Sequence, residues 1–227
     1  VMQRIELPSA GTDARLDEAI QWLTPLGAHD GSAWTNIAVA SADASFRRYF
    51  RVTSETGATA IVMDAPPPLE DVRPFLNISQ LLDDGGVYVP QRFASDEARG
   101  FLLLGDMGNT TYLSALTAAQ PADPQPLFAD AISTLVRLQQ IDPASAKLPL
   151  AHYDAALLRR EINLFPEWYL DRHVGVALSD DKKNALERVY ALLIASALGQ
   201  PTVLVHRDYM PRNLMVTPAR NPGVLDY

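Results

Sequence analysis

Three polar side chains close to the end of the sequence are spaced so that a short loop and a turn can bring them together. Asp208 and Asn213 are separated by four residues, and Asp226 follows a further apolar stretch and a turn. A carboxylate can accept a proton from a hydroxyl group, while a second carboxylate and an amide oxygen are ligands that Mg²⁺ favours. We therefore predict that Asp208 is a general base and that Asn213 and Asp226 hold a magnesium ion, as phosphoryl transfer requires.

The residues around this cluster make its chemistry more specific. Asp208 ends an H-R-D tripeptide that is followed four residues later by Asn, a pattern typical of kinase catalytic loops. Apolar runs at 203–205 and 214–216 flank it and predict strand, loop, strand, turn and strand. Asp and Asn also favour turns, so a purely structural role is the alternative. We expect His206 to hold the loop by hydrogen bonding and Arg207 to neutralise neighbouring carboxylates.

The first hundred residues contain no lysine that could bind nucleotide phosphates. Met63 occupies the strand position where kinases carry a lysine, and no glycine-rich loop precedes it. The corresponding turn ends at Ser45, whose hydroxyl and backbone N–H groups are candidate phosphate contacts. The lysines of the chain all come later, at Lys147, Lys182 and Lys183. The candidate substitutes are arginines of the next strand, Arg47, Arg48 and Arg51.

Among these arginines, Arg48 is the first candidate. On a strand it shares a face with Phe50 and Val52, and a cation on an apolar face would suit a phosphate ligand that points into a cleft. The alternative is an exposed basic strand. Glu70 could brace such an arginine or simply compensate a helix dipole. Asp106, in the predicted hinge, is a further candidate for nucleotide contact.

A second unusual stretch combines aromatic and acidic residues at 161–169. Glu161 could accept hydrogen bonds from sugar hydroxyls and Trp168 could stack on a sugar face, although aromatic clusters more often belong to a core. Arg212, next to the predicted metal ligand Asn213, is a third candidate for substrate contact. These three residues are our candidates for the substrate pocket.

Hydrophobic periodicity divides the chain into a strand-rich part and a helix-rich part. In the first part, it predicts helices at 13–26 and 69–84 and strands at 34–40, 47–53, 59–63, 89–94 and 101–104. In the second, it predicts a helix beginning at Asp123, a helix at 153–165 that Pro166 ends, and a helix at 180–198.

This order predicts an α+β, bilobal protein-kinase-like fold. Residues 1–104 would form an N-terminal nucleotide-binding lobe, mostly antiparallel sheet with one inserted helix. Residues 105–110 would be a hinge, and residues 111–227 a mainly helical C-terminal lobe that carries the catalytic hairpin.

Composition excludes several classes of partner. The net charge of −8 argues against nucleic acid or an anionic membrane as the main partner. No apolar run approaches the roughly 18 residues that a membrane span needs. The absence of cysteine excludes disulfides and thiolate zinc sites and fits a reducing compartment. We expect a cytoplasmic protein, with a monomer as the default.

Four segments, one of which contains the H-R-D motif, resemble a known group of enzymes. The motif with its Asn and the later Asp resembles the aminoglycoside phosphotransferase/choline kinase superfamily, which has a protein-kinase-like fold. More narrowly, the chain is similar to the bacterial anomeric sugar kinases that act on N-acetylmuramate and N-acetylglucosamine in cell-wall recycling. The segments that carry this similarity are 41–51, 61–67, 164–169, and 206–209 with 212–215.

The resemblance implies ATP-dependent phosphorylation of a small sugar at C1, giving a sugar 1-phosphate, with ATP and Mg²⁺ as cofactors. It also implies that the missing glycine loop and lysine are a trait of the family. Members of the family continue beyond the metal-binding Asp, so we expect the protein to extend past Tyr227. An arginine near the lactyl carboxylate of N-acetylmuramate would favour that sugar.

Two other functions remain open from the sequence. A kinase of an amino-alcohol or aminoglycoside would use the same fold, and an acidic protein suits a cationic substrate. A nucleotide-binding pseudokinase would explain the missing lysine and glycine loop, but the complete set of Asp208, Asn213 and Asp226 opposes it. A substrate panel and the magnesium dependence of ATP binding would separate these functions.

Overall fold

The chain forms two compact units. The computed structural model describes residues 13–42 and 46–227. One unit is made of Val1–Leu148 together with Leu204–Tyr227, and the other of Pro149–Val203. The predicted boundaries of the two lobes and of the hinge remain predictions. Within the described residues, no helix is both long and apolar enough to cross a membrane.

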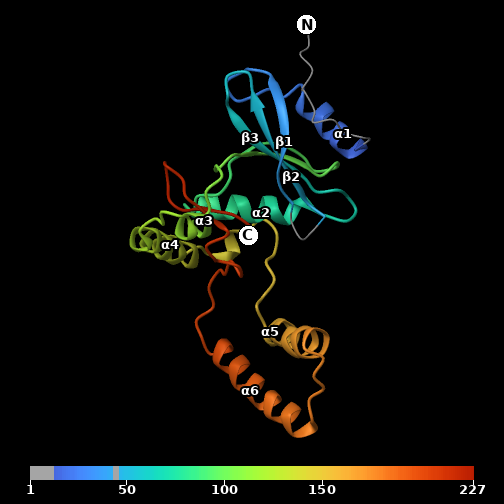
Figure 1. Ribbon diagram of the computed structural model, residues 1–227, viewed down its shortest axis with the longest axis vertical. Helices are drawn as coiled ribbons and strands as arrows, with labels where there is room; N and C mark the ends of the chain where they lie inside the picture. The colour runs from blue at the N-terminus through green and yellow to red at the C-terminus, as the bar shows by residue number, and fades with distance from the viewer. Residues whose placement is uncertain (1–12, 43–45) are drawn as a thin grey trace. The chain divides into compact units, whose positions relative to one another are not determined.

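A five-stranded antiparallel sheet lies at the centre of the larger unit (Figure 1). The strand order is β1-β2-β3-β5-β4, and each neighbouring pair is antiparallel. The strands are β1 (Trp34–Ala42), β2 (Arg48–Ser54), β3 (Thr59–Asp64), β4 (Arg92–Asp96) and β5 (Phe101–Gly105). All five predicted strands are present, and only β4 begins more than two residues from its expected start.

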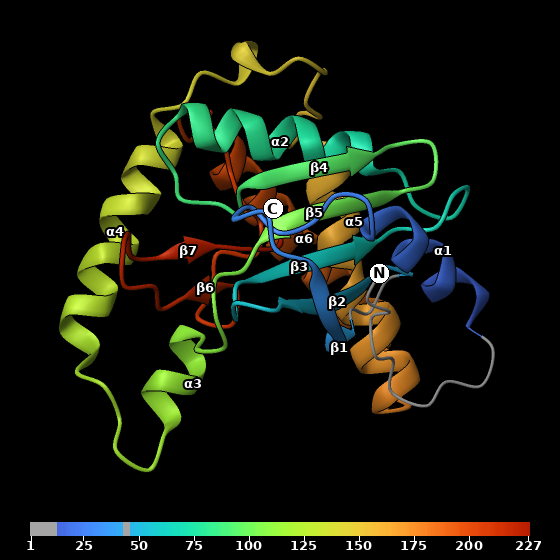
Figure 2. The same cartoon turned by 90° about the horizontal axis from the view of Figure 1, so that it is seen from above.

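The two faces of this sheet pack against different helices, α1 (Ala14–Leu23) and α2 (Val72–Asp84). On one face, Phe50 and Val52 pack with the apolar residues of α1. On the other, Met63 and Leu102 pack with residues of α2, which lies along the sheet (Figure 2). This separation follows from the alternation of side chains along a strand. It decides which residues of β2 can reach a site on the α2 side.

A buried carboxylate ties α1 to the sheet. Asp64, at the end of β3, has no exposed surface. One of its oxygens accepts from Arg15 Nε at 2.8 Å and the other from Arg48 at 2.6 Å. Arg48 also bonds to Asp13, whose pKa is lowered mainly by that hydrogen bond. The network lies on the α1 face, away from α2.

We expect Asp64→Asn to destabilise the larger unit by about 2–3 kcal/mol, because it removes the buried partner of two arginines that are themselves partly exposed. Urea unfolding followed by circular dichroism measures this loss. The matched control is Asp96→Asn, whose partner Arg99 is on the surface and whose loss should cost less than about 1 kcal/mol. Equal losses of unfolding free energy in the two variants would contradict a stabilising role of the buried Asp64 network.

Gly100 closes the turn between β4 and β5. Its φ is +74°, and an added Cβ would lie 1.9 Å from the carbonyl oxygen of Ala65. The backbone of Ala65 also donates to the Gly100 carbonyl at 2.9 Å. Only glycine satisfies both conditions, so this turn fixes the start of β5, the strand that leads into the predicted hinge.

The rest of the larger unit forms a second cluster beneath the sheet. It is built from α3 (Tyr112–Thr117), α4 (Pro124–Gln139), β6 (Leu214–Met215) and β7 (Gly223–Val224). Their buried side chains, among them Tyr112, Leu138 and Leu214, pack with Leu82 at the end of α2. The short α3 was not predicted. The strand expected at 203–205 is absent, because this segment has no strand partner.

The smaller unit is helical and contains α5 (Ala155–Leu164), η2 (Phe165–His173) and α6 (Asp180–Leu198). α5 and α6 are joined by Arg159, which bonds to Glu187 at 2.7 Å and lies over the ring of Tyr190. As predicted, the α-helix ends just before Pro166, since the last residue of α5 is Leu164. The chain continues directly as a π-helix, and Pro166 lies in its first turn, where a backbone N–H would have no intrahelical partner.

Candidate active site

Backbone hydrogen bonds fix the predicted catalytic loop against the cluster formed by α3, α4, β6 and β7. Val216 N donates to Thr110 O at 2.8 Å, and Leu113 N donates to Pro211 O at 2.9 Å. β6 and β7 pair antiparallel, and Val224 N donates to Tyr88 O at 2.8 Å. The hairpin that carries the predicted site residues is therefore held at both ends.

Asn213 connects the three predicted residues. Its amide nitrogen donates to the backbone oxygen of Asp208 at 3.1 Å and lies 3.5 Å from Oδ2 of Asp226. The backbone of Leu225 donates to the Asn213 carbonyl at 2.9 Å. Asp208 and Asp226 are exposed, while Asn213 is half-buried. The structure brings the three residues together as expected, and their catalytic roles remain a prediction.

Two residues of this site adopt the left-handed backbone conformation. Arg207, directly before Asp208, has φ of 75°, and Asp226 has φ of 59°. Such angles are unfavourable for residues other than glycine, and they persist where surrounding structure enforces them. Arg207 directly precedes the predicted general base, and Asp226 is itself a predicted metal ligand. The conformation therefore sets the direction in which the two carboxylates point.

Tyr227 anchors Asp226 to helix α2. Its ring stacks on Phe75 with centroids 5.2 Å apart, and its hydroxyl donates to Ser79 Oγ at 3.0 Å. Burial raises the pKa of Tyr227 well above its usual value. This contact was not predicted from the sequence, although Phe75 and Ser79 lie on one face of α2.

His206 holds the start of the catalytic loop. It is buried, its Nε2 lies 3.0 Å from the carbonyl oxygen of Leu225, and its ring meets Tyr209 edge-on. Tyr209 in turn donates to Ala131 O at 2.8 Å. Burial lowers the pKa of His206 and outweighs the opposing effects of the Leu225 carbonyl, Asp226 and Asp208. These contacts fit the predicted structural role.

Because the pKa of His206 is lowered, we expect the free energy of unfolding to depend on pH. Below about pH 6.5 the unfolded chain binds a proton that the folded chain resists, so stability falls by up to about 1.4 kcal/mol per pH unit until the folded pKa is reached. His206→Gln should lose this dependence, measured as unfolding free energy between pH 5 and 7.5. His29→Gln, at an exposed position, is the control. Parallel curves for wild type and His206→Gln would refute the prediction.

A cavity of about 410 Å³ opens beside the predicted metal ligands. Asn213, Asp226, Tyr227 and Arg212 form one part of its lining. The rest is largely apolar or comes from the segment after β5, and includes Tyr49, Ile61, Leu104, Met107 and Met215. An apolar cavity with a few polar groups at one end is the usual form of a small-molecule site.

Arg51 and Asp106 form the polar edge of this cavity. Arg51 Nε donates to Oδ2 of Asp106 at 2.6 Å, and a second guanidinium nitrogen donates to Oδ1 at 2.9 Å and to Gly108 O at 3.0 Å. Arg51 also bonds to Asn109. Burial raises the pKa of Asp106, but the bonds from Arg51 and from Gly108 N outweigh it, so that the pKa is lowered. Asp106 thus lines the cavity, and its contact with a nucleotide remains a prediction.

Gly223 allows the hairpin of β6 and β7 to approach Met107, in the segment after β5. An added Cβ at Gly223 would lie 2.6 Å from Met107 Sδ and 3.2 Å from Thr217 Cγ2. The backbone of β7 is therefore in close contact with the Met107 side chain that lines the cavity. A larger residue at position 223 would push the Met107 side chain away from β7.

The prediction that Arg48 points into the cleft is wrong. Its strand face is that of Phe50 and Val52, which packs on α1, and its guanidinium lies over the Phe50 ring. The cavity is lined from β2 by Tyr49 and Arg51, on the opposite face. The alternation of the strand was predicted correctly, but the wrong face was assigned to the cleft.

Two other candidates for nucleotide contact, Met63 and Glu70, do not line the cavity. Met63 is fully buried between the sheet and α2. Glu70 accepts from Phe46 N at 3.2 Å and lies 3.8 Å from Arg47, so it braces a neighbouring arginine rather than Arg48. Ser45 lies outside the described residues.

The substrate candidates are divided between the two units. Arg212 lines the cavity of the larger unit. Glu161 and Trp168 belong to the smaller unit, where Glu161 is half-buried and Trp168 is 55% exposed beneath the guanidinium of Arg172. The aromatic residues of this stretch are therefore not core. Their part in substrate binding remains a prediction.

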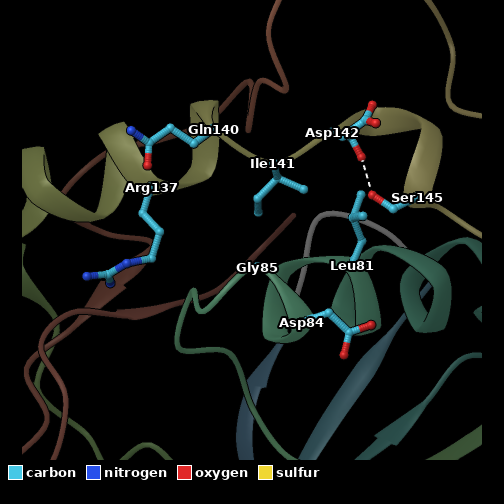
Figure 3. A pocket seen from close by; sticks show the side chains of 8 residues that line it. All are labelled: Leu81, Asp84, Gly85, Arg137, Gln140, Ile141, Asp142 and Ser145. Carbon is cyan, nitrogen blue, oxygen red and sulfur yellow. Dashed lines mark hydrogen bonds between the residues drawn. The ribbon is translucent and has the colours of Figure 1, made fainter.

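A second, smaller cavity of about 250 Å³ lies between the ends of α2 and α4. Figure 3 shows that Arg137 and Asp142 on its rim point away from each other, and that Ser145 bonds to the backbone of Asp142. Its floor is apolar, with Leu81 and Ile141. Charged groups do not converge here as they do around Asn213.

The residues of the larger cavity fit a magnesium ion by their donor chemistry. Asn213 and Asp226 provide amide and carboxylate oxygens, which Mg²⁺ binds, usually with few protein ligands and with substrate phosphates completing the coordination. Among the described residues, no group of three or more His, Cys, Asp or Glu side chains could hold a metal by itself. A site that needs phosphate oxygens agrees with this finding.

An antiparallel sheet, a hairpin with H-R-D and Asn, and an Asp at the cavity define a phosphotransferase of kinase-like fold. Residues 36–227 match the phosphotransferase enzyme family, and the chain belongs to this family. It is 50% identical over 222 residues to the N-acetylmuramate/N-acetylglucosamine kinase of Pseudomonas putida, covering 95% of this chain and 63% of that protein. The chain spans less than two thirds of the length of the curated relatives that it matches.

Solved structures show the same fold at low identity. The choline kinase LicA of Streptococcus pneumoniae has a TM-score of 0.58 at 14% identity, over 95% of this chain and 68% of that one. The ternary complex of APH(2″)-IIa with streptomycin and ATP has a TM-score of 0.54 at 17% identity, over 96% and 71%. These similarities confirm the predicted fold class.

Proposed function

We propose that the protein is an ATP-dependent kinase that phosphorylates the anomeric hydroxyl of N-acetylmuramate or N-acetylglucosamine. The observation that carries the proposal is the cluster of Asp208, Asn213 and Asp226 beside a cavity of the larger unit. The sugar is inferred from the name of the Pseudomonas putida relative. ATP is inferred from the family and from the ternary complex of the structural neighbour.

In this mechanism, the side chain of Asp208 accepts the proton of the anomeric hydroxyl as the sugar oxygen attacks the γ-phosphorus. The new bond joins the sugar oxygen to phosphorus, the bond to the β-phosphate oxygen breaks, and ADP leaves. An anomeric hydroxyl is more acidic than an ordinary alcohol, so orientation of the hydroxyl and neutralisation of charge account for most of the rate.

Asn213 and Asp226 would hold the magnesium ion, which when bound would neutralise charge on the nucleotide phosphates. The amide nitrogen of Asn213 bonds to the backbone of Asp208, which keeps the general base in a fixed position relative to these oxygens. Tyr227 and the left-handed conformation of Asp226 restrict the direction of the carboxylate. The chain thus positions base and ligands on one hairpin.

A coupled assay of ADP release tests the proposal with four acceptors: N-acetylmuramate, N-acetylglucosamine, choline and an aminoglycoside. The expected result is turnover with one or both sugars. The methyl glycoside of N-acetylglucosamine is the matched control, because its anomeric oxygen cannot be phosphorylated. Turnover of the methyl glycoside would refute phosphorylation at C1, and ³¹P NMR of the product identifies the position directly.

A kinase for a cationic amino-alcohol or aminoglycoside is the second candidate. The net charge of −8 favours it, since an acidic surface attracts cations. In the same panel, this function would give turnover with choline or the aminoglycoside and none with either sugar.

A further inference from the structure

The cavity contains an arginine whose charge nothing in the described structure neutralises. Nucleotide phosphates bring several negative charges to a kinase site, and the first hundred residues offer no lysine to meet them. Among the described residues that line the cavity there is no lysine, so the candidate cations of the protein at this site are arginines. The geometry of each candidate arginine decides which one is available.

The arginines of β2 are each committed to a carboxylate. Arg48 is on the α1 face, bonded to the buried Asp64. Arg51 faces the cavity, but both oxygens of Asp106 bind its guanidinium, and this pairing raises its pKa. Recruitment of Arg51 to a phosphate would leave Asp106, whose side chain is only 7% exposed, without its partner.

Arg47 is the remaining arginine of this segment. It precedes the first residue of β2 and lies 3.8 Å from Glu70, which also accepts from the backbone of Phe46. Arg47 does not line the cavity of the metal ligands. The guanidinium of Arg47 therefore lies near the carboxylate that precedes α2, and not at the cavity.

Arg212 differs from all three. It is exposed, it lines the cavity, and it directly precedes Asn213 on the catalytic loop. Within residues 13–42 and 46–227, it has no hydrogen bond or ion pair. The neighbouring segment is rigid, since Asn213 N donates to Met210 O and Leu113 N donates to Pro211 O, both at 2.9 Å. A free cation is therefore held beside the predicted metal ligands.

We infer that Arg212 binds the phosphoryl group in transit and supplies a positive charge at the γ-phosphate in a site whose sheet carries no lysine. This inference rests on the proposed function. As the sugar oxygen attacks and the bond to ADP breaks, negative charge on the equatorial oxygens of the phosphoryl group meets the guanidinium, while the proton goes to Asp208. A planar guanidinium matches two such oxygens at once. The phosphate-binding cation then comes from the catalytic loop and not from the sheet.

The two sugars form a matched pair that tests this role in the full-length protein. N-acetylmuramate carries a lactyl carboxylate that N-acetylglucosamine lacks. If Arg212 binds the phosphoryl group, Arg212→Met lowers kcat about 10²-fold for both sugars. Arg212→Lys keeps the positive charge, and its kcat should be about tenfold higher than that of Arg212→Met. A rise in KM for N-acetylmuramate alone would overturn the inference and make Arg212 a ligand of the substrate carboxylate.

A nucleotide titration keeps the inference testable if neither sugar is the substrate. Arg212→Met should weaken binding of Mg²⁺–ATP about tenfold and leave binding of Mg²⁺–ADP nearly unchanged, because only ATP carries the γ-phosphoryl group. Arg188→Met, at an exposed position of α6, is the control and should change neither affinity. Equal affinities of Arg212→Met and wild type for Mg²⁺–ATP would refute the inference. Loss of sugar turnover in the wild type would refute only the proposed function.

Discussion

Asp208→Asn lowers kcat by about 10³-fold on the expected mechanism, because it removes the general base and keeps the shape of the side chain. Binding of Mg²⁺–ATP should stay within about threefold of wild type, since Asp208 is absent from the cavity lining formed by Asn213 and Asp226. Coupled ADP release measures the first quantity and isothermal titration calorimetry the second.

The loop should survive this substitution. The Asn213 amide donates to the backbone oxygen of residue 208. A change in the side chain at position 208 leaves this hydrogen bond in place. Circular dichroism should therefore match wild type. If Asp208→Asn kept more than about a tenth of the activity, Asp208 would be a turn residue, as the structural alternative holds.

Asp226→Asn should lower turnover by about 10³-fold for a different reason. It removes a carboxylate from the predicted magnesium site, and the lost stabilisation of phosphate charge is several kcal/mol. Unlike Asp208→Asn, this variant should lose most of the effect of Mg²⁺ on ATP affinity. Calorimetry of ATP binding with and without Mg²⁺ separates the two variants.

Leu225 lies next to Asp226 on the same hairpin and supplies a control. Leu225→Val keeps its backbone carbonyl, which is the partner of His206, and should leave the magnesium effect intact. A pseudokinase would show ATP affinity that does not depend on Mg²⁺ in the wild type as well. That result would contradict the proposed roles of both Asn213 and Asp226.

The fold was predictable wherever the hydrophobic period was regular. The five strands of the sheet and α6 were expected near their observed positions, because alternation and helical spacing report burial directly. The segment at 203–205 has the composition of a strand, but it finds no partner. Pro166 was expected to end a helix, and α5 does end just before it, but local propensity does not reveal that the chain continues as a π-helix.

The site was predictable in its catalytic loop and less so in its nucleotide contacts. A local motif placed Asp208, Asn213 and Asp226 correctly beside one another. The face of β2 that lines the cavity depends on which helix covers which side of the sheet, and a strand pattern does not contain that information. For this reason Arg48 was favoured over Arg51. Tyr227 was missed because its partner Ser79 is far away in sequence.

The larger unit is interrupted in sequence, since the whole of Pro149–Val203 is inserted between its two parts. The residues proposed to carry the chemistry lie in the part of the larger unit that follows this insertion. The entropic penalty of closing such a loop rises slowly with its length, by about 0.6 kcal/mol per doubling. A change in the length of this segment should therefore have little effect on the stability of the hairpin that carries the predicted site. A chimera that carries the corresponding segment of a relative should keep a folded hairpin.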